Sequence, residues 1–218
     1  MQGVLEERFS RLLGEPVRVI GAGRTDAGVH ALGQAANFQT SRPIPLERLL
    51  GVLNGSLPSD VKVQSCQEVE EEFHARRAAR SRTYRYTVRE RTEPSPLLGR
   101  YALVVPPGLE VERMEQVARR LVGERDFRAF QGGGAETKST VRRLVRLECR
   151  REGEAIAITA EANSFLYQMM RIIAAALLEV GRGGMTEGDV LRALQAGERR
   201  MLPGPAPACG LCLLGVSY

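Results

Sequence analysis

Tryptophan is absent from the 218-residue sequence and lysine nearly so, because Lys62 and Lys138 are the only two lysines among 31 Lys and Arg residues. Almost every positive charge is therefore an arginine, whose planar guanidinium suits bidentate binding of phosphate and stacking on bases. Lys and Arg outnumber Asp and Glu by 31 to 26, which gives a net charge of +5 and a pI near 9.3. This excess favours a polyanionic partner. GC-rich codons would also favour arginine, so the bias alone leaves both explanations open.

Long apolar runs are missing as well. The longest, residues 172–178, falls well short of the roughly 18 to 20 residues that span a bilayer. Residues 6–8 are Glu-Glu-Arg, where a signal peptide would have a cationic segment followed by an apolar one. We therefore expect no membrane partner and a cytoplasmic location.

Cysteine is scarce, and the four cysteines are too scattered for a disulfide framework. Cys209 and Cys212 have the spacing of a redox pair, but they lie in an apolar, strand-like run. A redox pair normally opens a helix, whose N-terminus lowers the thiol pKa. A second pair of zinc ligands is also absent from the sequence. We interpret both cysteines as small apolar residues of a strand and expect no metal site.

The apolar periodicity indicates an α+β fold with mostly antiparallel sheets, because strands and helices do not alternate regularly. Helices are predicted at residues 2–13, 45–53, 111–122, 164–180 and 187–196, and strands at 17–20, 33–38, 61–69, 83–89, 141–150, 155–160 and 211–216. We expect Asn163 or Ser164 to cap the fourth helix and Thr186 the fifth.

The chain is long enough for one large domain or for two of about 100 residues each. Residues 92–108 hold four prolines and two glycines and separate two parts of similar size. We therefore predict an N-terminal α/β half, 1–98, and a C-terminal α/β half, 99–218. Residues 131–138 form a second glycine-rich segment, which either closes over a ligand or simply connects two elements.

The most specific segment is a glycine-rich turn at residues 20–30, Ile-Gly-Ala-Gly-Arg-Thr-Asp-Ala-Gly-Val-His. A dinucleotide site would require a third glycine where Asp26 stands, and a helix after it. Alternatively, the glycines hold the backbone so that Arg24 and Asp26 project into a cleft. Asp26 also has a purely local interpretation, in which its side chain bonds its own turn. The spacing alone favours this local interpretation.

Arg171 lies in a predicted helix, residues 165–178, that is apolar around much of its circumference. An unpaired guanidinium in such a place is costly, so Arg171 needs an anionic partner. Asp26 is a good candidate, because the arginine would keep the carboxylate ionised and oriented. The alternative is that Arg171 extends past its apolar neighbours to solvent.

Residues 73–86 are the densest basic region, with five arginines and two interleaved tyrosines. This composition suits RNA, since guanidinium groups bind phosphates and rings stack on unpaired bases. Tyr84 and Tyr86 could equally be core residues of a strand. We expect Tyr84 to contact the substrate and Tyr86 to lie in the core, although the spacing of the two tyrosines does not distinguish these roles.

These segments together resemble the TruA family of tRNA pseudouridine synthases, whose signature is similar to residues 24–30, Arg-Thr-Asp-Ala-Gly-Val-His. Further matches follow in family order along nearly the whole chain. They are residues 34–38 (Gln-Ala-Ala-Asn-Phe), 53–58 (Leu-Asn-Gly-Ser-Leu-Pro), 73–76 (Phe-His-Ala-Arg), 84–86 (Tyr-Arg-Tyr), 126–130 (Asp-Phe-Arg-Ala-Phe), 165–171 (Phe-Leu-Tyr-Gln-Met-Met-Arg), and 210–213 (Gly-Leu-Cys-Leu) with Tyr218.

The resemblance implies a role for each matching residue. Asp26 corresponds to the catalytic aspartate, Arg24 to the arginine that helps expel the target base, and Arg171 to the arginine paired with the aspartate. Tyr84 would stack on the target uracil, and Leu211 would make an apolar contact near it. Arg76 and His30 lie in matching motifs, and we expect both to contact substrate.

The same resemblance implies isomerisation of uridine to pseudouridine on the 3′ side of the tRNA anticodon stem-loop, without any cofactor. It also implies a homodimer with two similar α/β halves, whose sheets join around a central cleft. A tRNA-binding module without catalysis is the main alternative function. A nucleotide-dependent oxidoreductase, argued from the glycine-rich turn, is a weaker one.

The start of the chain departs from the family pattern. Family members usually begin with a strand carrying a Tyr-Asp-Gly-Thr segment, a Gly-Trp-Gln and a Thr-Val-Gln, whereas this chain begins Met-Gln-Gly-Val-Leu. Lack of that strand would expose an edge of the N-terminal sheet and weaken stability, dimerisation or RNA binding.

Overall fold

The computed structural model describes residues 1–42, 45–93, 95–134 and 137–218. These residues fall into two compact units, a smaller one of residues 1–24 and 35–79, and a larger one of residues 25–34 and 80–218. Both contain helices and strands, and most strand pairs are antiparallel, which confirms the predicted α+β class. No helix of the described residues is long and apolar enough to cross a membrane.

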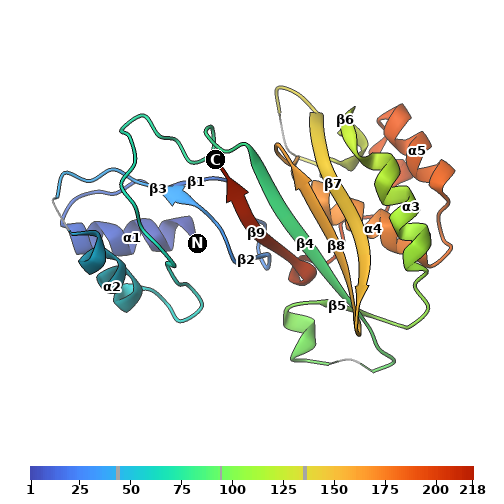
Figure 1. Cartoon of the computed structure of the whole chain (residues 1–218), viewed down its shortest axis with the longest axis horizontal. Helices are drawn as coiled ribbons and strands as arrows, with labels where there is room; N and C mark the ends of the chain where they lie inside the picture. Colours follow the sequence, from blue (N-terminus) through green and yellow to red (C-terminus); the bar gives the residue numbers. More distant parts are fainter. Residues whose placement is uncertain (43–44, 94, 135–136) are drawn as a thin grey trace. The chain divides into compact units, whose positions relative to one another are not determined.

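The smaller unit packs two helices with a two-stranded sheet (Figure 1). Helix α1 (Gln2–Leu13) ends at Gly14, whose φ of 66° is the left-handed conformation that glycine adopts without strain. Helix α2 (Leu46–Ser56) packs against α1, and strand β1 (Ile20–Gly21) pairs antiparallel with β3 (Ala36–Asn37). The buried core of this unit consists of Phe9, Leu13, Val17, Val19, Leu49 and Leu53.

The larger unit is built on a seven-stranded sheet of order β2-β9-β4-β8-β7-β6, with β5 paired to β4. Two pairs, β2 with β9 and β4 with β5, are parallel, and the others are antiparallel. The strands are β2 (His30–Ala31), β4 (Ser81–Glu90), β5 (Leu103–Val105), β6 (Gly123–Asp126), β7 (Val141–Glu152), β8 (Ala155–Ala162) and β9 (Leu211–Ser217).

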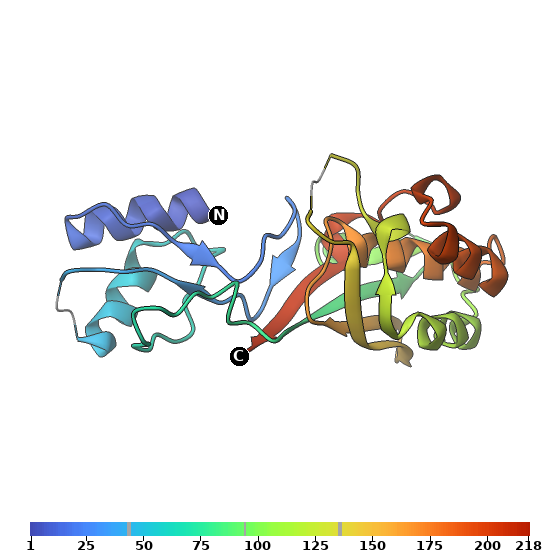
Figure 2. The same ribbon diagram turned by 90° about the horizontal axis from the view of Figure 1, so that it is seen from above.

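Three helices cover one face of this sheet: α3 (Val111–Leu121), α4 (Met169–Gly181) and α5 (Glu187–Ala196). Figures 1 and 2 show all three on the same side of the strands. Side chains alternate along β4, so Tyr84, Tyr86 and Val88 are buried on the covered face while Arg85 and Arg89 lie on the other. This alternation confirms the apolar and basic faces predicted for the strand.

The helix predictions differ from the structure mainly at helix ends. Residues 2–13 and 187–196 are helical as predicted, and Thr186 caps α5 in a capping box with Asp189. The predicted capping of the fourth helix by Asn163 or Ser164 is wrong, because α4 begins only at Met169. The residue before it, Gln168, has a φ of 57°, so the backbone leaves helical geometry there.

The strand predicted at residues 61–69 is also wrong, since these residues form no strand. Asn54 explains part of the difference: its side-chain amide donates to the carbonyl of Val63 at 2.9 Å and accepts from the Val63 N–H at 2.8 Å. A side chain thus satisfies backbone groups that a neighbouring strand would otherwise bind. Strands β2, β5 and β6 were not predicted, because two to four residues are too few to show an alternation.

The predicted division into halves 1–98 and 99–218 stays a prediction. The boundaries of the two compact units differ from it, because β4 pairs with β8 and β9 along much of its length. Strand β4 therefore belongs to the same unit as the C-terminal strands. Residues 92–108 run from β4 to β5 and beyond, and β5 pairs with β4 in the same sheet.

Three short 3-10 helices complete the part of the larger unit that carries the candidate site: η1 (Leu98–Arg100), η3 (Arg199–Met201) and η4 (Ala208–Gly210). Element η4 leads directly into β9 at a close approach to β4. The Tyr86 hydroxyl donates to the carbonyl of Pro207 at 2.8 Å, and a Cβ on Gly210 would lie 2.7 Å from the Tyr86 ring.

We therefore predict that Gly210→Ala destabilises the protein by about 1–3 kcal/mol, because the new methyl overpacks a buried ring. Gly204→Ala is the matched control, since a Cβ there meets nothing within 4 Å. Its effect should stay within about 0.5 kcal/mol. Urea unfolding followed by circular dichroism measures both. Equal midpoints for wild type and Gly210→Ala would show that the Tyr86 contact does not require glycine.

Candidate active site

Asp26 opens a tight turn in the larger unit. The Val29 N–H donates to the Asp26 carbonyl at 3.1 Å, and Gly28 has a φ of 81°, the value of the third position of a type II turn. A Cβ on Gly28 would also come within 3.3 Å of the Ala208 side chain. The glycine therefore serves both the turn and its close approach to η4, and this fixes the backbone from which Asp26 projects.

Arg171 lies in the first turn of α4, a helix whose other residues are almost all buried. A cation at that position opposes the helix dipole, and surrounding apolar side chains raise the cost of an unpaired charge. Only 14% of the Arg171 side chain is exposed. The alternative in which Arg171 extends to solvent is therefore wrong.

The anionic partner of Arg171 is Asp26. The Arg171 Nη1 donates to the Asp26 Oδ2 at 2.6 Å, a distance typical of a charge-assisted hydrogen bond, and 22% of the Asp26 side chain is exposed. Within the described part of the chain, Arg171 is the one hydrogen-bond partner of this carboxylate, so the local interpretation, in which Asp26 bonds its own turn, does not hold. The Oδ1 atom receives no hydrogen bond from any described residue.

A proline-rich segment holds the guanidinium in place. Arg171 Nε donates to the Ala206 carbonyl at 2.7 Å, and the Ala206 N–H donates to the Arg171 carbonyl at 3.1 Å. Both side chain and backbone of Arg171 are thus bonded to one residue of the segment between η3 and η4. The guanidinium, held at Nε by the carbonyl and at Nη1 by the carboxylate, has little freedom to rotate.

Tyr84 lies on β4 near this pair. Its side chain packs edge-to-face on Phe165, with ring centroids 5.0 Å apart and planes at 81°, and the residue is 8% exposed. Burial raises the pKa of Tyr84 to about 12, with Arg82 acting in the opposite direction and the Asp26 carboxylate adding to the rise. The phenol is therefore protonated at neutral pH. Its role as a stacking surface stays a prediction.

Tyr86 and Leu211 form the neighbouring layer. Tyr86 is completely buried, which confirms its assignment to the core, and burial raises the pKa of its hydroxyl. Leu211, the first residue of β9, is buried opposite Tyr86 across the two strands. Strand pairing places it on the same sheet face as Tyr84, and its contact with a base stays a prediction.

His30 follows the Asp26 turn and begins β2, where it pairs with Cys212 of β9. Its Nε2 lies 2.7 Å from the Arg100 carbonyl, and its ring lies 4.9 Å from the ring of Tyr101. The larger unit thus contains five of the seven predicted site residues: Asp26, Arg171, Tyr84, Leu211 and His30. Arg24 and Arg76 belong to the smaller unit, where both are exposed, and their roles stay predictions.

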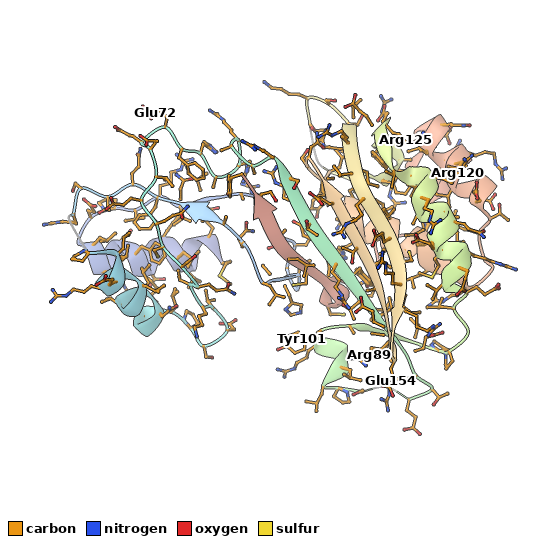
Figure 3. The ribbon with its side chains drawn as sticks, viewed as in Figure 1. Glu72, Arg89, Tyr101, Arg120, Arg125 and Glu154 are labelled. Atoms are coloured by element: carbon orange, nitrogen blue, oxygen red, sulfur yellow. The ribbon has the colours of Figure 1, made fainter. Side chains whose placement is uncertain are left out.

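The basic region predicted to contact RNA divides into two groups. Two of its arginines lie on β4 and contact protein groups: Arg85 pairs with Glu152 at 2.5 Å, and Arg82 Nη1 donates to the Asn163 carbonyl at 2.7 Å. Arg89, just beyond, lies 3.6 Å from Glu154, and Figure 3 shows these two together at one end of the sheet. Residues 76, 77 and 80 are exposed and keep the predicted basic character.

Sequence reasoning missed two parts of this site. Arg82 is a buried cation on the face of β4 that also carries Tyr84, and it was missed because the strand was expected to begin at residue 83. Extending the two-residue alternation by one step would have found it. Residues 202–207, Leu-Pro-Gly-Pro-Ala-Pro, supply the Ala206 and Pro207 carbonyls. Their three alternating prolines were the available signal for a stiff segment.

The dinucleotide interpretation of the glycine-rich turn is wrong. After Gly28 the chain enters strand β2, so the helix N-terminus that would hold a pyrophosphate does not follow in the described residues. Cys212 lies in β9 as predicted, whereas Cys209 lies in η4. All four cysteines have free thiols, and burial raises the pKa of Cys149 and Cys212.

Comparison with known proteins identifies the family of the chain. A family model described as tRNA pseudouridine synthase matches residues 1–76 and 117–218. Tyr84 lies between these ranges. Among curated relatives, tRNA pseudouridine synthase A of Caldicellulosiruptor bescii is 39% identical over 218 residues, and that of Pelobacter propionicus is 41% identical. In Clostridium perfringens, tRNA pseudouridine synthase A 2 is 37% identical.

Each of these alignments covers 100% of this chain and 89% of the relative. The family match extends over both compact units, and the segments with Asp26 and Arg171 both lie inside it. The chain therefore belongs to the tRNA pseudouridine synthase family, the isomerases that convert uridine in tRNA to pseudouridine.

Proposed function

We propose that this protein isomerises uridine to pseudouridine on the 3′ side of the tRNA anticodon stem-loop, with Asp26 as the catalytic carboxylate. The observation that carries this proposal is the Asp26–Arg171 pair, in which Oδ2 is bound to the guanidinium while Oδ1 has no donor among the described residues. An ionised carboxylate with one oxygen held and the other free is suited to attack carbon or to accept a proton.

The reaction is an internal rearrangement. The bond between N1 of uracil and C1′ of ribose breaks, a bond between C5 and C1′ forms, and the proton lost from C5 is balanced by one gained at N1. No electrons are gained or lost overall, so the chemistry requires no redox cofactor. Asp26 would act at the sugar, either as a nucleophile on C1′ or as a base on a ribose proton.

The target nucleotide must leave its stack to reach Asp26, which costs a few kcal/mol and is offset by stacking and phosphate contacts. We propose that Tyr84 and Leu211 contact the everted uracil, and that Arg24 helps to expel it. Support for the first two comes from their common sheet face and the proximity of Tyr84 to Asp26. For Arg76, a phosphate contact fits its exposed guanidinium, and His30 is proposed to contact the substrate from the Asp26 loop.

The finer statements rest on resemblance to the TruA family alone. They are the anticodon stem-loop as target, a homodimer as the acting species, and a cytoplasmic location. A tRNA-binding module without catalysis is the alternative, and the following experiment distinguishes it from an enzyme.

Asp26→Asn should abolish pseudouridine formation, with a loss of at least about 10²-fold in rate, because the amide neither attacks carbon nor accepts a proton. The measurement is chemical mapping of pseudouridine in an unmodified tRNA transcript. Asp60→Asn, at an exposed position of the smaller unit, is the matched control and should retain full activity. If wild type binds the transcript without forming product, the protein is a binding module, and an active Asp26→Asn variant would exclude Asp26 as the catalyst.

Arg171 is a positioning residue, because it acts through Asp26. Arg171→Met should lower kcat by about 10²-fold while KM changes little, since a displaced carboxylate impairs chemistry more than tRNA binding. Arg182→Met is the control, at an exposed ion pair just after the same helix. Steady-state kinetics with the same transcript separates the two constants. A rise in KM with unchanged kcat would place Arg171 in tRNA binding instead.

Tyr84 should act through its ring, because a phenol with a pKa raised to about 12 stays protonated at the pH of the reaction. Tyr84→Phe keeps the ring and should retain most of the activity, whereas Tyr84→Leu should lose roughly tenfold, the order expected for one stacked base. Single-turnover rates measure both variants. Equal losses in Tyr84→Phe and Tyr84→Leu would show that the hydroxyl is required.

A further inference from the structure

One aromatic pair in the larger unit includes a residue, Tyr101, that has had no role so far. It is formed by His30 and Tyr101, whose ring centroids are 4.9 Å apart with planes at 44°. His30 lies four residues after Asp26, just beyond the turn closed by the Val29 N–H, and it begins β2 beside β9. Tyr101 precedes β5, which pairs with β4. Both ends of the pair are therefore anchored in the sheet that carries Tyr84 and Leu211.

A short hydrogen bond holds the His30 ring. Its Nε2 lies 2.7 Å from the carbonyl oxygen of Arg100. A carbonyl can only accept, so Nε2 must carry the proton and donate. The ring is thus fixed in tautomer and orientation, and it offers Tyr101 a stable support.

Tyr101, which lies between η1 and β5, is 66% exposed, whereas Tyr84 and Tyr86 on β4 are buried. One part of its ring rests on His30 and the rest faces solvent. Figure 3 shows the Tyr101 side chain beside η1. The preceding residue, Arg100, is also exposed, so a cation directly precedes the open ring in the chain.

We propose that Tyr101, supported by His30 and flanked by Arg100, is a stacking platform for an unpaired nucleotide of the bound tRNA other than the target uridine. An exposed ring beside a guanidinium is the combination that binds single-stranded RNA without reading its sequence, because every base has a stacking face and every nucleotide a phosphate. This proposal rests on the proposed function. In it, Tyr101 makes a second base contact with the tRNA, near the loop that carries Asp26.

The position of the platform suggests why a second contact is useful. Once the target is everted, its neighbours lose a stacking partner, and a ring near the catalytic loop replaces part of that lost stacking. Because His30 and Asp26 share one loop, a nucleotide stacked on Tyr101 would also help to orient the target relative to the carboxylate.

The test compares Tyr101→Ala, Tyr101→Phe and Leu97→Ala for binding of an unmodified tRNA transcript, measured by fluorescence anisotropy. Leu97 is the matched control, because it lies in the same segment and is 81% exposed. Tyr101→Ala should weaken binding roughly tenfold, whereas Tyr101→Phe, which keeps the ring, should stay within about twofold of wild type. Leu97→Ala should bind as wild type does.

A second readout reports stacking itself. With 2-aminopurine placed in turn at each unpaired position of the anticodon arm, one position should be quenched on binding to wild type and to Tyr101→Phe but not to Tyr101→Ala. Thermal unfolding of each variant identifies any loss that is merely structural.

Several results would overturn the platform. They are unchanged binding by Tyr101→Ala, equal weakening by Tyr101→Phe, a loss matched by Leu97→Ala, or a change of oligomeric state that accounts for the effect. The proposed function fails separately: if wild type forms no pseudouridine while Tyr101→Ala still loses affinity, the platform stands without catalysis. If wild type is active, and Tyr101→Ala has the same activity and the same affinity for tRNA, only the platform is refuted.

Discussion

The site depends on one interaction, the ion pair that joins Arg171 in the first turn of α4 to Asp26 in the glycine-rich loop. A guanidinium in an apolar helix N-terminus is unfavourable alone, and a carboxylate without a partner has no fixed direction. The carboxylate neutralises the guanidinium, and the guanidinium fixes the orientation of the carboxylate. The result is an ionised acid that is partly exposed, oriented through one oxygen and available through the second.

The surroundings of this pair restrict its geometry further. Gly28 permits the turn that presents Asp26, and its lack of a side chain lets the loop approach Ala208. Ala206, two residues earlier, binds Arg171 through both its N–H and its carbonyl. The segment between η3 and η4 thus contacts Arg171, and it continues through η4, which approaches the Asp26 loop at Gly28. Element η4 leads into β9, where Leu211 is buried beside Tyr86. Loop, helix and sheet therefore position the carboxylate together.

Local patterns in the sequence predicted much of this arrangement. The alternation around Tyr84 predicted the apolar and basic faces of β4. The apolar environment of Arg171 indicated an anionic partner, for which Asp26 was a good candidate. The pairing joins residues 145 positions apart, so no local pattern could establish it. Family resemblance supplied the roles, and the matched family model supports the assignment of the chain.

What the sequence did not predict depends on tertiary contacts. Helix α4 begins late because Gln168 adopts a left-handed conformation, which no capping pattern reveals. Residues 61–69 carry apolar residues at strand-like spacing, yet the Asn54 side chain satisfies the backbone of Val63. The arginines of β4 appeared free for RNA until cross-strand partners such as Glu152 were visible. For Val63 and Arg85, contacts with another segment override the local strand pattern or its predicted role.

The most direct test of this account is a double-mutant cycle on the stability of the protein, with wild type, Asp26→Asn, Arg171→Ala and the double variant compared by urea unfolding. If the pair fixes the carboxylate, the two substitutions should be coupled by about 1–3 kcal/mol, because the second removes a partner that the first has already stranded. Additive effects, within about 0.5 kcal/mol, would contradict the central claim that each group stabilises the other.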